Sequence, residues 1–390
     1  MGLSIDSFVH ALEPLLRLPL APLAIAALAA LRNSDAADAL YILRTQPGKE
    51  AAREFLAVVR RAIRESKLLK LVLAIVAART LNRVGHRLFV DRQARRRIDW
   101  RRHVVVISGG ARGIGGGVAE RLADRGAKVV TLDMAERTAH SRETRHFKAD
   151  VTDEAQLLEV RERIHKELGM VTMVVACAGI ARPCAVLDPP DVISLAYHTK
   201  MVDVNLNGTL NFIRVFSQDM LPKAKEGEPR VEGGAPANGW GGHILMIASG
   251  AAFTSLPYNA MYSASKAGAV ALWTSLGWEL DVVHKARGVR NSVMCPLKVA
   301  TAMTDNERMS DQADQFMTPT LSVEQVADRM VQILESDRGQ MVHLPAAANA
   351  IALLSPALPD WLRRAIFKAL GAQRTFFAFA QNNRRMVADP

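Results

Sequence analysis

Two residues one helical turn apart, Tyr262 and Lys266, carry the strongest chemical signal in the sequence. They lie in an Ala-rich run that predicts the start of a helix, where residues four apart share one face. A free phenol has a pKa of about 10, and a nearby ammonium lowers that pKa by favouring the phenolate. The pair is therefore predicted to exchange a proton with an alcohol or a ketone. Taken alone, the same spacing also fits a surface lysine one turn after a core tyrosine.

A glycine-rich turn follows the β-branched run 103–108, which itself predicts a buried parallel strand. Its glycines let a backbone approach a pyrophosphate, and the predicted helix 116–125 points free N–H groups at the same anion. A second strand, 127–132, ends at Asp133, 18 residues after Gly115, close to the roughly 20 expected for an acid that binds the adenosine ribose. Asp133 favours NAD, because its carboxylate accepts hydrogen bonds from the ribose and repels a 2′-phosphate. Arg112 favours NADP, because an arginine there can bind that phosphate.

Short apolar runs alternate with helical periods along the rest of the chain. Further strands are predicted at 147–151, 170–176, 243–248, 290–294 and 341–344, and helices at 153–168, 199–220 and from Tyr262 onward. About seven strands alternating with helices predict an α/β fold, a Rossmann-type doubly wound parallel sheet. Ligands of such sheets bind at the carboxyl ends of the strands. The residues expected there are Ser108, Asp133, Asp150, Cys177, Ser249 and Pro296.

Motifs spread over residues 103–345 resemble those of the classical short-chain dehydrogenase/reductase superfamily. In chain order they are Ser108-Gly109-x-x-x-Gly113-Ile114-Gly115, Asp150 with Val151, Ala178-Gly179, Asn205, Ser249, Tyr262 with Lys266, and Pro296-x-x-Val299-x-Thr301. The sequence departs from the family pattern in three motifs: Ser108 replaces threonine, Ala176-Cys177 replace two asparagines, and Leu297 replaces glycine. None of these departures removes a group that transfers a proton.

The resemblance implies hydride transfer between nicotinamide and a carbinol or carbonyl carbon. Tyr262 would exchange the proton with the substrate oxygen, and Lys266 would lower the pKa of Tyr262 and bind the nicotinamide ribose. Ser249 would hold the substrate oxygen, and Asn205 would hold a water that relays protons to solvent. These four residues form the expected catalytic set.

The resemblance also implies which residues contact the cofactor, and that the protein is a homodimer or homotetramer joined through the helices bearing Asn205 and Tyr262. The expected cofactor contacts are Ser108, Gly109, Arg112, Gly113, Ile114, Gly115, Asp133, Asp150, Val151, Ala178, Gly179, Tyr262, Lys266, Pro296, Val299 and Thr301.

The expected substrate is a hydrophobic alcohol or ketone, steroid-, retinoid- or lipid-like, because apolar side chains such as Phe253, Leu256 and Tyr258 follow Ser249. NAD is the expected cofactor, and an NADPH-dependent ketone reductase is the alternative that Arg112 supports. An alternative of another class is a catalytically silent nucleotide-binding protein whose basic extension carries the function. The 3 cysteines have no metal-binding spacing, so no metal is expected, and their odd number indicates a reducing compartment.

The positive charge of the chain is concentrated before the predicted strand at 103. Residues 1–102 hold 19 Lys+Arg and 9 Asp+Glu, a net charge of +10 out of a total of +11. Residues 49–97 predict a basic amphipathic helix that can lie on an anionic membrane, pack on the following domain or pair with a second copy. Nucleic acid is not expected as a partner, because no aromatic residues interleave with the charges.

The sequence thus predicts three parts: a basic, partly helical extension (1–102), a dehydrogenase domain (103–345) and an apolar helical tail (346–390). The tail is expected to pack in part as core, and also to cap the substrate cleft or to contact a membrane or another subunit. The uncharged run 18–31 holds 14 residues, too few for a membrane span of about 20. We therefore expect a cytoplasmic protein, peripheral to the inner face of a membrane.

Overall fold

A computed structural model of the chain describes residues 96–136, 144–182, 184–189, 194–223, 234–255, 257–301, 320–346 and 348–369, and part of 74–90. The chain divides into two compact units, Met1–Arg92 and Gln93–Pro390, and the motifs named above lie in the second. The expectations for residues 1–73 and 370–390 lie outside the described residues. Within the described ranges, no helix has the length and apolar character needed to cross a membrane.

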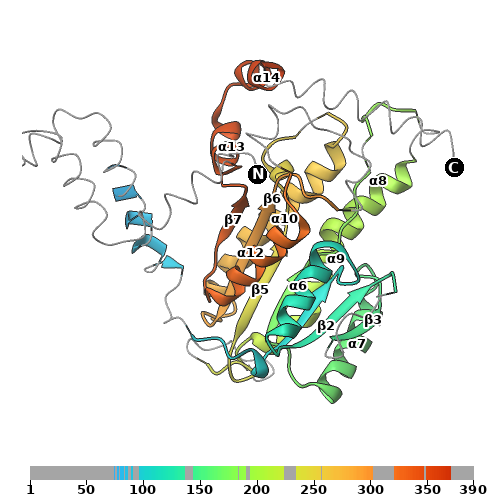
Figure 1. Ribbon diagram of the computed structural model, residues 1–390, viewed down its shortest axis with the longest axis vertical. Coiled ribbons are helices and arrows are strands. Elements are labelled where there is room, and N and C mark those ends of the chain that lie inside the picture. The colour runs from blue at the N-terminus through green and yellow to red at the C-terminus, as the bar shows by residue number, and fades with distance from the viewer. Residues whose placement is uncertain are drawn as a thin grey trace, which may run out of the picture. The chain divides into compact units, whose positions relative to one another are not determined.

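The second unit is built on a parallel sheet of seven strands in the order β3-β2-β1-β4-β5-β6-β7 (Figure 1). The strands are β1 (Val104–Ser108), β2 (Lys128–Asp133), β3 (Thr144–Lys148), β4 (Met173–Ala176), β5 (Gly242–Ile247), β6 (Val289–Pro296) and β7 (Met341–Leu344). The strand order reverses between β1 and β4, which is the point where doubly wound sheets bind ligands. The predicted Rossmann-type sheet is therefore confirmed.

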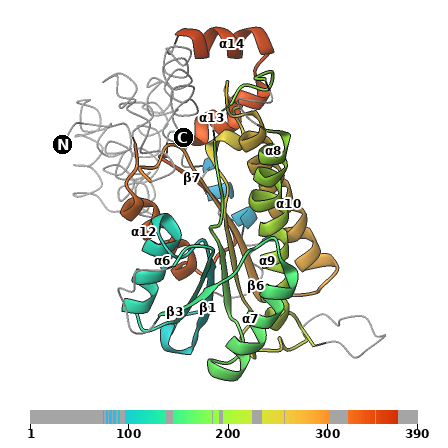
Figure 2. The ribbon, with the colours of Figure 1, turned by 90° about the vertical axis from the view of Figure 1, so that its right-hand side faces the viewer.

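Successive side chains of each strand enter two different cores, one on each face of the sheet. In β1, Val104 and Val106 face a core formed with α7 (Glu154–Glu167) and α9 (Gly208–Phe216). Val105 and Ile107 face a core formed with α6 (Gly113–Asp124) and α12 (Val323–Glu335). Figure 2 shows α6 and α12 on one side of the sheet and α7, α9 and α10 (Ala260–Val282) on the other. Burial on both faces explains why β1 is a continuous apolar run.

Two predicted elements differ from the observed ones. The strand expected at 147–151 lies at Thr144–Lys148, because the chain turns at Asp150 to begin α7, whose first turn is capped by Asp153. The single helix expected at 199–220 is interrupted. It consists of α8 (Leu195–Val202), a π-helical turn at Asp203–Asn207 and α9, followed by a 3-10 turn at Gln218–Met220.

Two further helices follow β7 beyond the carboxyl end of the sheet. They are α13 (Ala348–Leu354) and α14 (Asp360–Ala369), joined by a 3-10 turn at Ser355–Ala357 (Figure 1). α13 contacts the 3-10 turn η4 (Gly250–Ala252), which directly follows β5. The tail thus reaches the end of the sheet where a ligand is expected.

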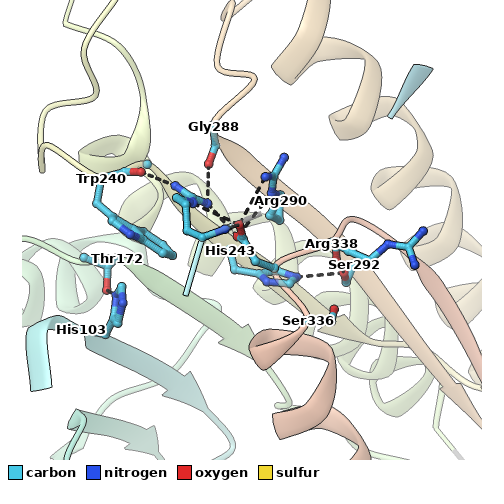
Figure 3. A network of polar contacts seen from close by, with 12 residues as sticks. His103, Thr172, Trp240, His243, Gly288, Arg290, Ser292, Ser336 and Arg338 are labelled. Carbon is cyan, nitrogen blue, oxygen red and sulfur yellow. Dashed lines mark hydrogen bonds and ion pairs between the residues drawn. The ribbon is translucent and has the colours of Figure 1, made fainter. Parts of the chain in front are cut away.

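The opposite, amino-terminal end of the sheet holds a buried cluster of charges around Asp337 (Figure 3). Arg96 donates from its Nε and Nη2 to the two oxygens of Asp337 at 3.1 and 2.8 Å, and from its backbone N–H at 2.8 Å. Arg290 donates to the same carboxylate, at 3.3 Å to each oxygen. Burial alone would raise the pKa of Asp337, but the hydrogen bonds from Arg96 and Arg290 outweigh it, and the net shift is downward.

Arg96 also holds the loops that lead into neighbouring strands. Its guanidinium donates to the carbonyl oxygens of Trp240 and Gly288, which precede β5 and β6, and lies 3.8 Å from the centre of the Trp240 ring. The His103 ring also packs on Trp240, with 4.3 Å between the ring centres. Burial and, after it, the charge of Arg96 lower the pKa of His103 to about 4, so its imidazole is neutral at pH 7. Arg96, which the sequence placed in the extension, is thus bonded to the segments before β5, β6 and β7 of the sheet domain.

Candidate active site

The turn after β1 and the first turn of α6 pack too tightly for a side chain at Gly109 or at Gly115. A Cβ added at Gly109, whose φ is +65°, would lie 2.8 Å from the backbone of Ala178. A Cβ added at Gly115 would lie 2.3 Å from the carbonyl oxygen of Gly109. Ser108 fixes the same region, because its Oγ accepts hydrogen bonds from the backbone N–H groups of Cys177 and Ala178, each at 3.2 Å. The serine that replaces the family threonine therefore still ties β1 to β4.

Asp133 ends β2 beside this turn, as expected. Its carboxylate accepts hydrogen bonds from the backbone N–H of Ala111 at 3.1 Å and of Ala135 at 3.0 Å. The acid is thus held against the glycine-rich turn, where it can meet a ribose. Arg112 is the N-cap residue of α6, its side chain is exposed, and Gly113 and Ile114 begin the helix behind it.

Asp150 and Val151 lie just after β3 rather than within it. The Asp150 carboxylate accepts hydrogen bonds from the backbone N–H and the hydroxyl of Thr152, at 2.9 and 2.8 Å. Val151 is buried against Gly208, where a Cβ would lie 2.6 Å from Val151 Cγ2. Both residues therefore lie beyond the strand, which ends earlier than predicted, and Val151 packs on the first residue of α9.

Lys266 is buried at the centre of the site, with 4% of its surface exposed. Its Nζ donates a hydrogen bond to the carbonyl oxygen of Ile247, at 3.1 Å, and lies 5.8 Å from the centre of the Tyr262 ring. Burial lowers the pKa of Lys266 to about 8. Burial also raises the pKa of the Cys177 and Cys295 thiols to about 12, so both are neutral at pH 7. The ammonium charge is therefore not neutralised by a thiolate.

Asn205 lies in the π-helical turn, fully buried. Its Oδ1 accepts from the backbone N–H of Ile180 at 2.8 Å, and its Nδ2 donates to the carbonyl of Ile180 at 2.9 Å and to Ser265 Oγ at 3.1 Å. The amide therefore joins the loop after Ala178-Gly179 to the helix that carries Lys266. π-turns are rare and occur often at functional sites, because the extra residue turns a side chain toward a partner that an unbroken helix would miss.

Ser249 ends the β5 segment and caps the 3-10 turn η4. Its Oγ accepts from the backbone N–H of Ala251 at 3.1 Å and donates to the carbonyl oxygen of Pro296 at 3.5 Å. The ends of β5 and β6 are thereby joined next to the first turn of α10, which contains Tyr262. Beyond Pro296, Val299 is buried in a bridge with Leu321, and Thr301 ends the described segment.

Two residues of the site were not predicted from the sequence: Ser265, which bonds Asn205, and Gly250, which contacts the side chain of Leu297. Ser265 directly precedes Lys266 on a largely apolar helix. A polar residue at a buried position of such a helix was the signal that could have indicated a hydrogen-bond partner. The pairing of Gly250 with Leu297 gave no local signal, because the two residues are far apart in sequence.

Residues 103–312 match the family model described as short chain dehydrogenase. The chain belongs to this family. The match spans more than half of the 390 residues, and it confirms the resemblance drawn from the motifs. The protein is therefore an oxidoreductase that acts on CH–OH groups and uses a nicotinamide cofactor, in a family whose members are commonly oligomeric.

Several curated dehydrogenases are similar to this chain at low identity. Rat 17-beta-hydroxysteroid dehydrogenase 13 is 25% identical over 287 residues, which cover 70% of this chain and 86% of the rat protein. The 1-deoxy-11-beta-hydroxypentalenate dehydrogenase of Streptomyces avermitilis is 31% identical over 60% of this chain and 81% of its own length. Human 3-hydroxyacyl-CoA dehydrogenase type-2 is 32% identical over 50% of this chain and 72% of its own length.

Among solved structures, a short chain dehydrogenase from Burkholderia cenocepacia in complex with NADP has the same fold. It is 24% identical, covers 69% of this chain and 97% of its own length, and has a TM-score of 0.52.

Proposed function

We propose that the protein interconverts a hydrophobic alcohol and its ketone, with NAD(H) as the favoured cofactor. The observation that carries the proposal is the buried ammonium of Lys266 one turn after Tyr262, held by its hydrogen bond to the carbonyl oxygen of Ile247. Gly113 supports a pyrophosphate at this turn, because its φ is +59° and nothing lies within 4 Å of the position that a Cβ would take, so a ligand can approach the backbone there. The bound nicotinamide would supply or accept the hydride.

The protein side chains would handle the proton. The Lys266 ammonium would favour the phenolate form of Tyr262, because a nearby positive charge stabilises a negative one. Tyr262 would then take the hydroxyl proton of the alcohol or return it to the ketone. Ser249 would hold the substrate oxygen, and its fixed position at the joined ends of β5 and β6 supports that role. Asn205 would hold the relay water at the kinked helix.

The role of Tyr262 is tested by the Tyr262→Phe variant. Removing the hydroxyl should lower kcat about 10²- to 10⁴-fold, the usual contribution of acid–base catalysis, and leave nucleotide affinity near the wild-type value. The measurement is NAD and NADP reduction with steroid, retinoid and long-chain alcohols. A near-normal rate in the phenylalanine variant would rule out the assignment. Nucleotide binding without turnover by the wild type on every alcohol would favour the silent binding protein.

The preference for NAD rests on Asp133. Its carboxylate is fixed by the N–H groups of Ala111 and Ala135 and has unused acceptor capacity for ribose hydroxyls. An NADPH-dependent ketone reductase is the alternative, supported by the exposed Arg112 at the start of α6. The ratio of the two nucleotide dissociation constants decides between them.

A hydrophobic substrate is supported by the apolar groups around η4. Phe253 ends this turn and packs on His343, with ring centres 5.1 Å apart, while α13 approaches the same turn. Tyr258 follows on the loop, and Leu256 lies outside the described residues. Two of the similar proteins are named as dehydrogenases of a hydroxysteroid and of a hydroxypentalenate, and a hydroxysteroid is a largely apolar alcohol. The alcohol panel above separates the steroid, retinoid and lipid classes.

A homodimer or homotetramer through the helices after Asn205 and from Tyr262 is supported by large apolar side chains on their outer faces. Leu210 on α9 is 37% exposed, and Trp278 and Val282 on α10 are 68% and 57% exposed. Size-exclusion chromatography with light scattering should give a dimer or tetramer, and Trp278→Glu should shift it toward the monomer. A monomeric wild type would contradict this assembly.

Peripheral contact with an anionic membrane at a cytoplasmic surface is supported by α14 as well as by the net charge of residues 1–102. Trp361 and Ile366 are exposed on one side of this helix, and Arg363, Arg364 and Lys368 lie on the other. Such a pattern is typical of helices that lie in a membrane interface. The full-length chain should sediment with phosphatidylserine vesicles in a salt-sensitive way, and no sedimentation at low salt would contradict the contact.

A further inference from the structure

Leu297 stands where the family has glycine, directly after Pro296 at the carboxyl end of β6. Its backbone N–H donates to the carbonyl oxygen of Leu344, at 2.8 Å, which fixes it at the end of β7. The preceding carbonyl, that of Pro296, accepts the hydrogen bond from Ser249 Oγ. The backbone of Leu297 is therefore anchored within one residue of a group that holds Ser249.

The Leu297 side chain occupies the space beside Gly250. A Cβ added at Gly250 would lie 2.2 Å from Leu297 Cδ2 and 3.4 Å from its Cγ. Gly250 is not among the glycines with positive φ, so its backbone conformation is open to other residues. A side chain at Gly250 is thus opposed by the leucine and not by backbone strain. The two residues form a matched pair, with a large side chain just after β6 and a missing one on η4.

This pair lies at the neighbouring carboxyl ends of β5 and β6. Gly250 directly follows Ser249, which would hold the substrate oxygen, and Leu297 directly follows Pro296, which is expected to contact the nicotinamide. Leu297 is only partly buried, and its side chain fills the volume beside Gly250. A glycine at the same position would leave that volume empty.

We propose that Leu297 is a specificity-determining residue that fills the substrate site on the Ser249 side. The inference rests on the proposed function and adds the shape of the substrate to it. One substituent of the carbinol carbon must lie beside Leu297 and must be small, such as a hydrogen or a methyl group. The other substituent extends away and carries the hydrophobic bulk. The preferred substrates are then primary alcohols and secondary alcohols with one short arm.

Three isomeric alcohols test the inference, because they differ only in the position of the hydroxyl and so in the length of the short arm. We would measure kcat/KM for 2-decanol, 3-decanol and 4-decanol with the wild type, Leu297→Ala and Leu297→Gly. The wild type should prefer 2-decanol over 4-decanol, and the glycine variant should raise the ratio of 4-decanol to 2-decanol at least about tenfold, the usual effect of one methylene in an apolar pocket. The ratio for Leu297→Ala should lie between those of the wild type and Leu297→Gly. This variant replaces Leu297→Gly in the test if the glycine variant folds poorly.

Two further variants separate packing from specificity. Leu168→Ala removes a half-buried leucine at the end of α7 and should leave the ratio unchanged. Gly250→Ala forces Leu297 to move, so it should change kcat/KM in the wild-type background and have little effect in the Leu297→Gly background. A coupling of about tenfold between the two substitutions would support the pair.

The possible failures are distinguishable. If the wild type shows no turnover that depends on Tyr262, the proposed function is overturned and this inference with it. If turnover depends on Tyr262 but the decanol ratio is the same in Leu297→Gly and the wild type, only the inference is overturned. Additive effects of Gly250→Ala and Leu297→Gly would likewise overturn it, because they would show that the two side-chain positions do not compete for one space.

Discussion

The buried ammonium of Lys266 carries an unfavourable free energy that a Lys266→Met variant should release. Its hydrogen-bond acceptor is the neutral carbonyl of Ile247, and the nearby thiols of Cys177 and Cys295 remain protonated at pH 7. Burial therefore lowers the pKa of Lys266 from 10.5 to about 8. At about 1.4 kcal/mol for each tenfold change, this difference costs the folded state about 3 kcal/mol at pH 7.

The pH dependence follows from which state binds the proton. Below about pH 8 the folded and unfolded chains both hold it, so the full cost is present. Between about pH 8 and 10.5 the unfolded chain still holds the proton and the folded chain has lost it, so the free energy of unfolding of the wild type rises with pH. A methionine has no proton to lose. The stability of the variant relative to the wild type should therefore fall by most of about 3 kcal/mol between pH 7 and pH 10.

At pH 7, the free energies of unfolding of Lys266→Met and the wild type should differ by less than this pH-dependent change. The variant leaves the carbonyl of Ile247 without its donor, which costs about 1–3 kcal/mol at every pH. We would measure urea unfolding of the ligand-free full-length chain by tryptophan fluorescence at pH 7, 8, 9 and 10. Lys166→Met, at an exposed position of α7, controls for the loss of one positive charge. A difference between Lys266→Met and the wild type that is the same at pH 7 and pH 10 would refute the reasoning.

Three further substitutions test the cofactor site and the cluster around Asp337. Asp133→Ala should reduce the preference for NAD over NADP about tenfold or more, since a charged hydrogen bond to the ribose is lost; titration with both nucleotides measures it, and an unchanged ratio would assign the preference to other residues. Gly115→Ala should abolish tight nucleotide binding in calorimetry, because its Cβ would meet the Gly109 carbonyl at 2.3 Å, whereas Gly116→Ala, with its nearest contact at 3.6 Å, should bind normally; equal affinities would contradict this difference. Arg96→Ala should lower the free energy of unfolding by about 3 kcal/mol, as expected for a broken buried ion pair, and the exposed Arg97→Ala should change it little; equal effects in denaturant titrations would show that the contacts of Arg96 do not stabilise the fold.

Local patterns in the sequence predicted the sheet because each strand is buried on both faces. The run 103–108 and its counterparts are largely apolar, and the alternation with helical periods leaves few topologies. The position of Asp133 beside the glycine-rich turn was equally predictable, since the two are close in sequence. The structure places Asp133 against the turn through Ala111, as that unit requires.

Contacts between distant residues were not predictable from the same patterns. The apolar period of 199–220 continues through the π-turn, so nothing local marks the extra residue that directs Asn205 toward Ile180. The sequence around Arg96 predicts only a basic amphipathic helix. In the structure its guanidinium binds Asp337, which is 241 residues away and gives no signal near position 96.

The Asp337 cluster also determines where this enzyme can be shortened. The family match begins at residue 103, and a chain cut there would lose Arg96 together with Ile98 and Trp100, which pack on one of the two cores. Asp337 would then lose one of the two arginines bonded to it, and the ring of Trp240 would lose the cation that covers it. The shortened enzyme would lose stability because the Asp337 cluster is broken. Any resulting loss of activity would then be wrongly assigned to a function of the extension. A chain that begins at Gln93, the first residue of the second unit, lacks the preceding segment but keeps Arg96 and the Asp337 cluster.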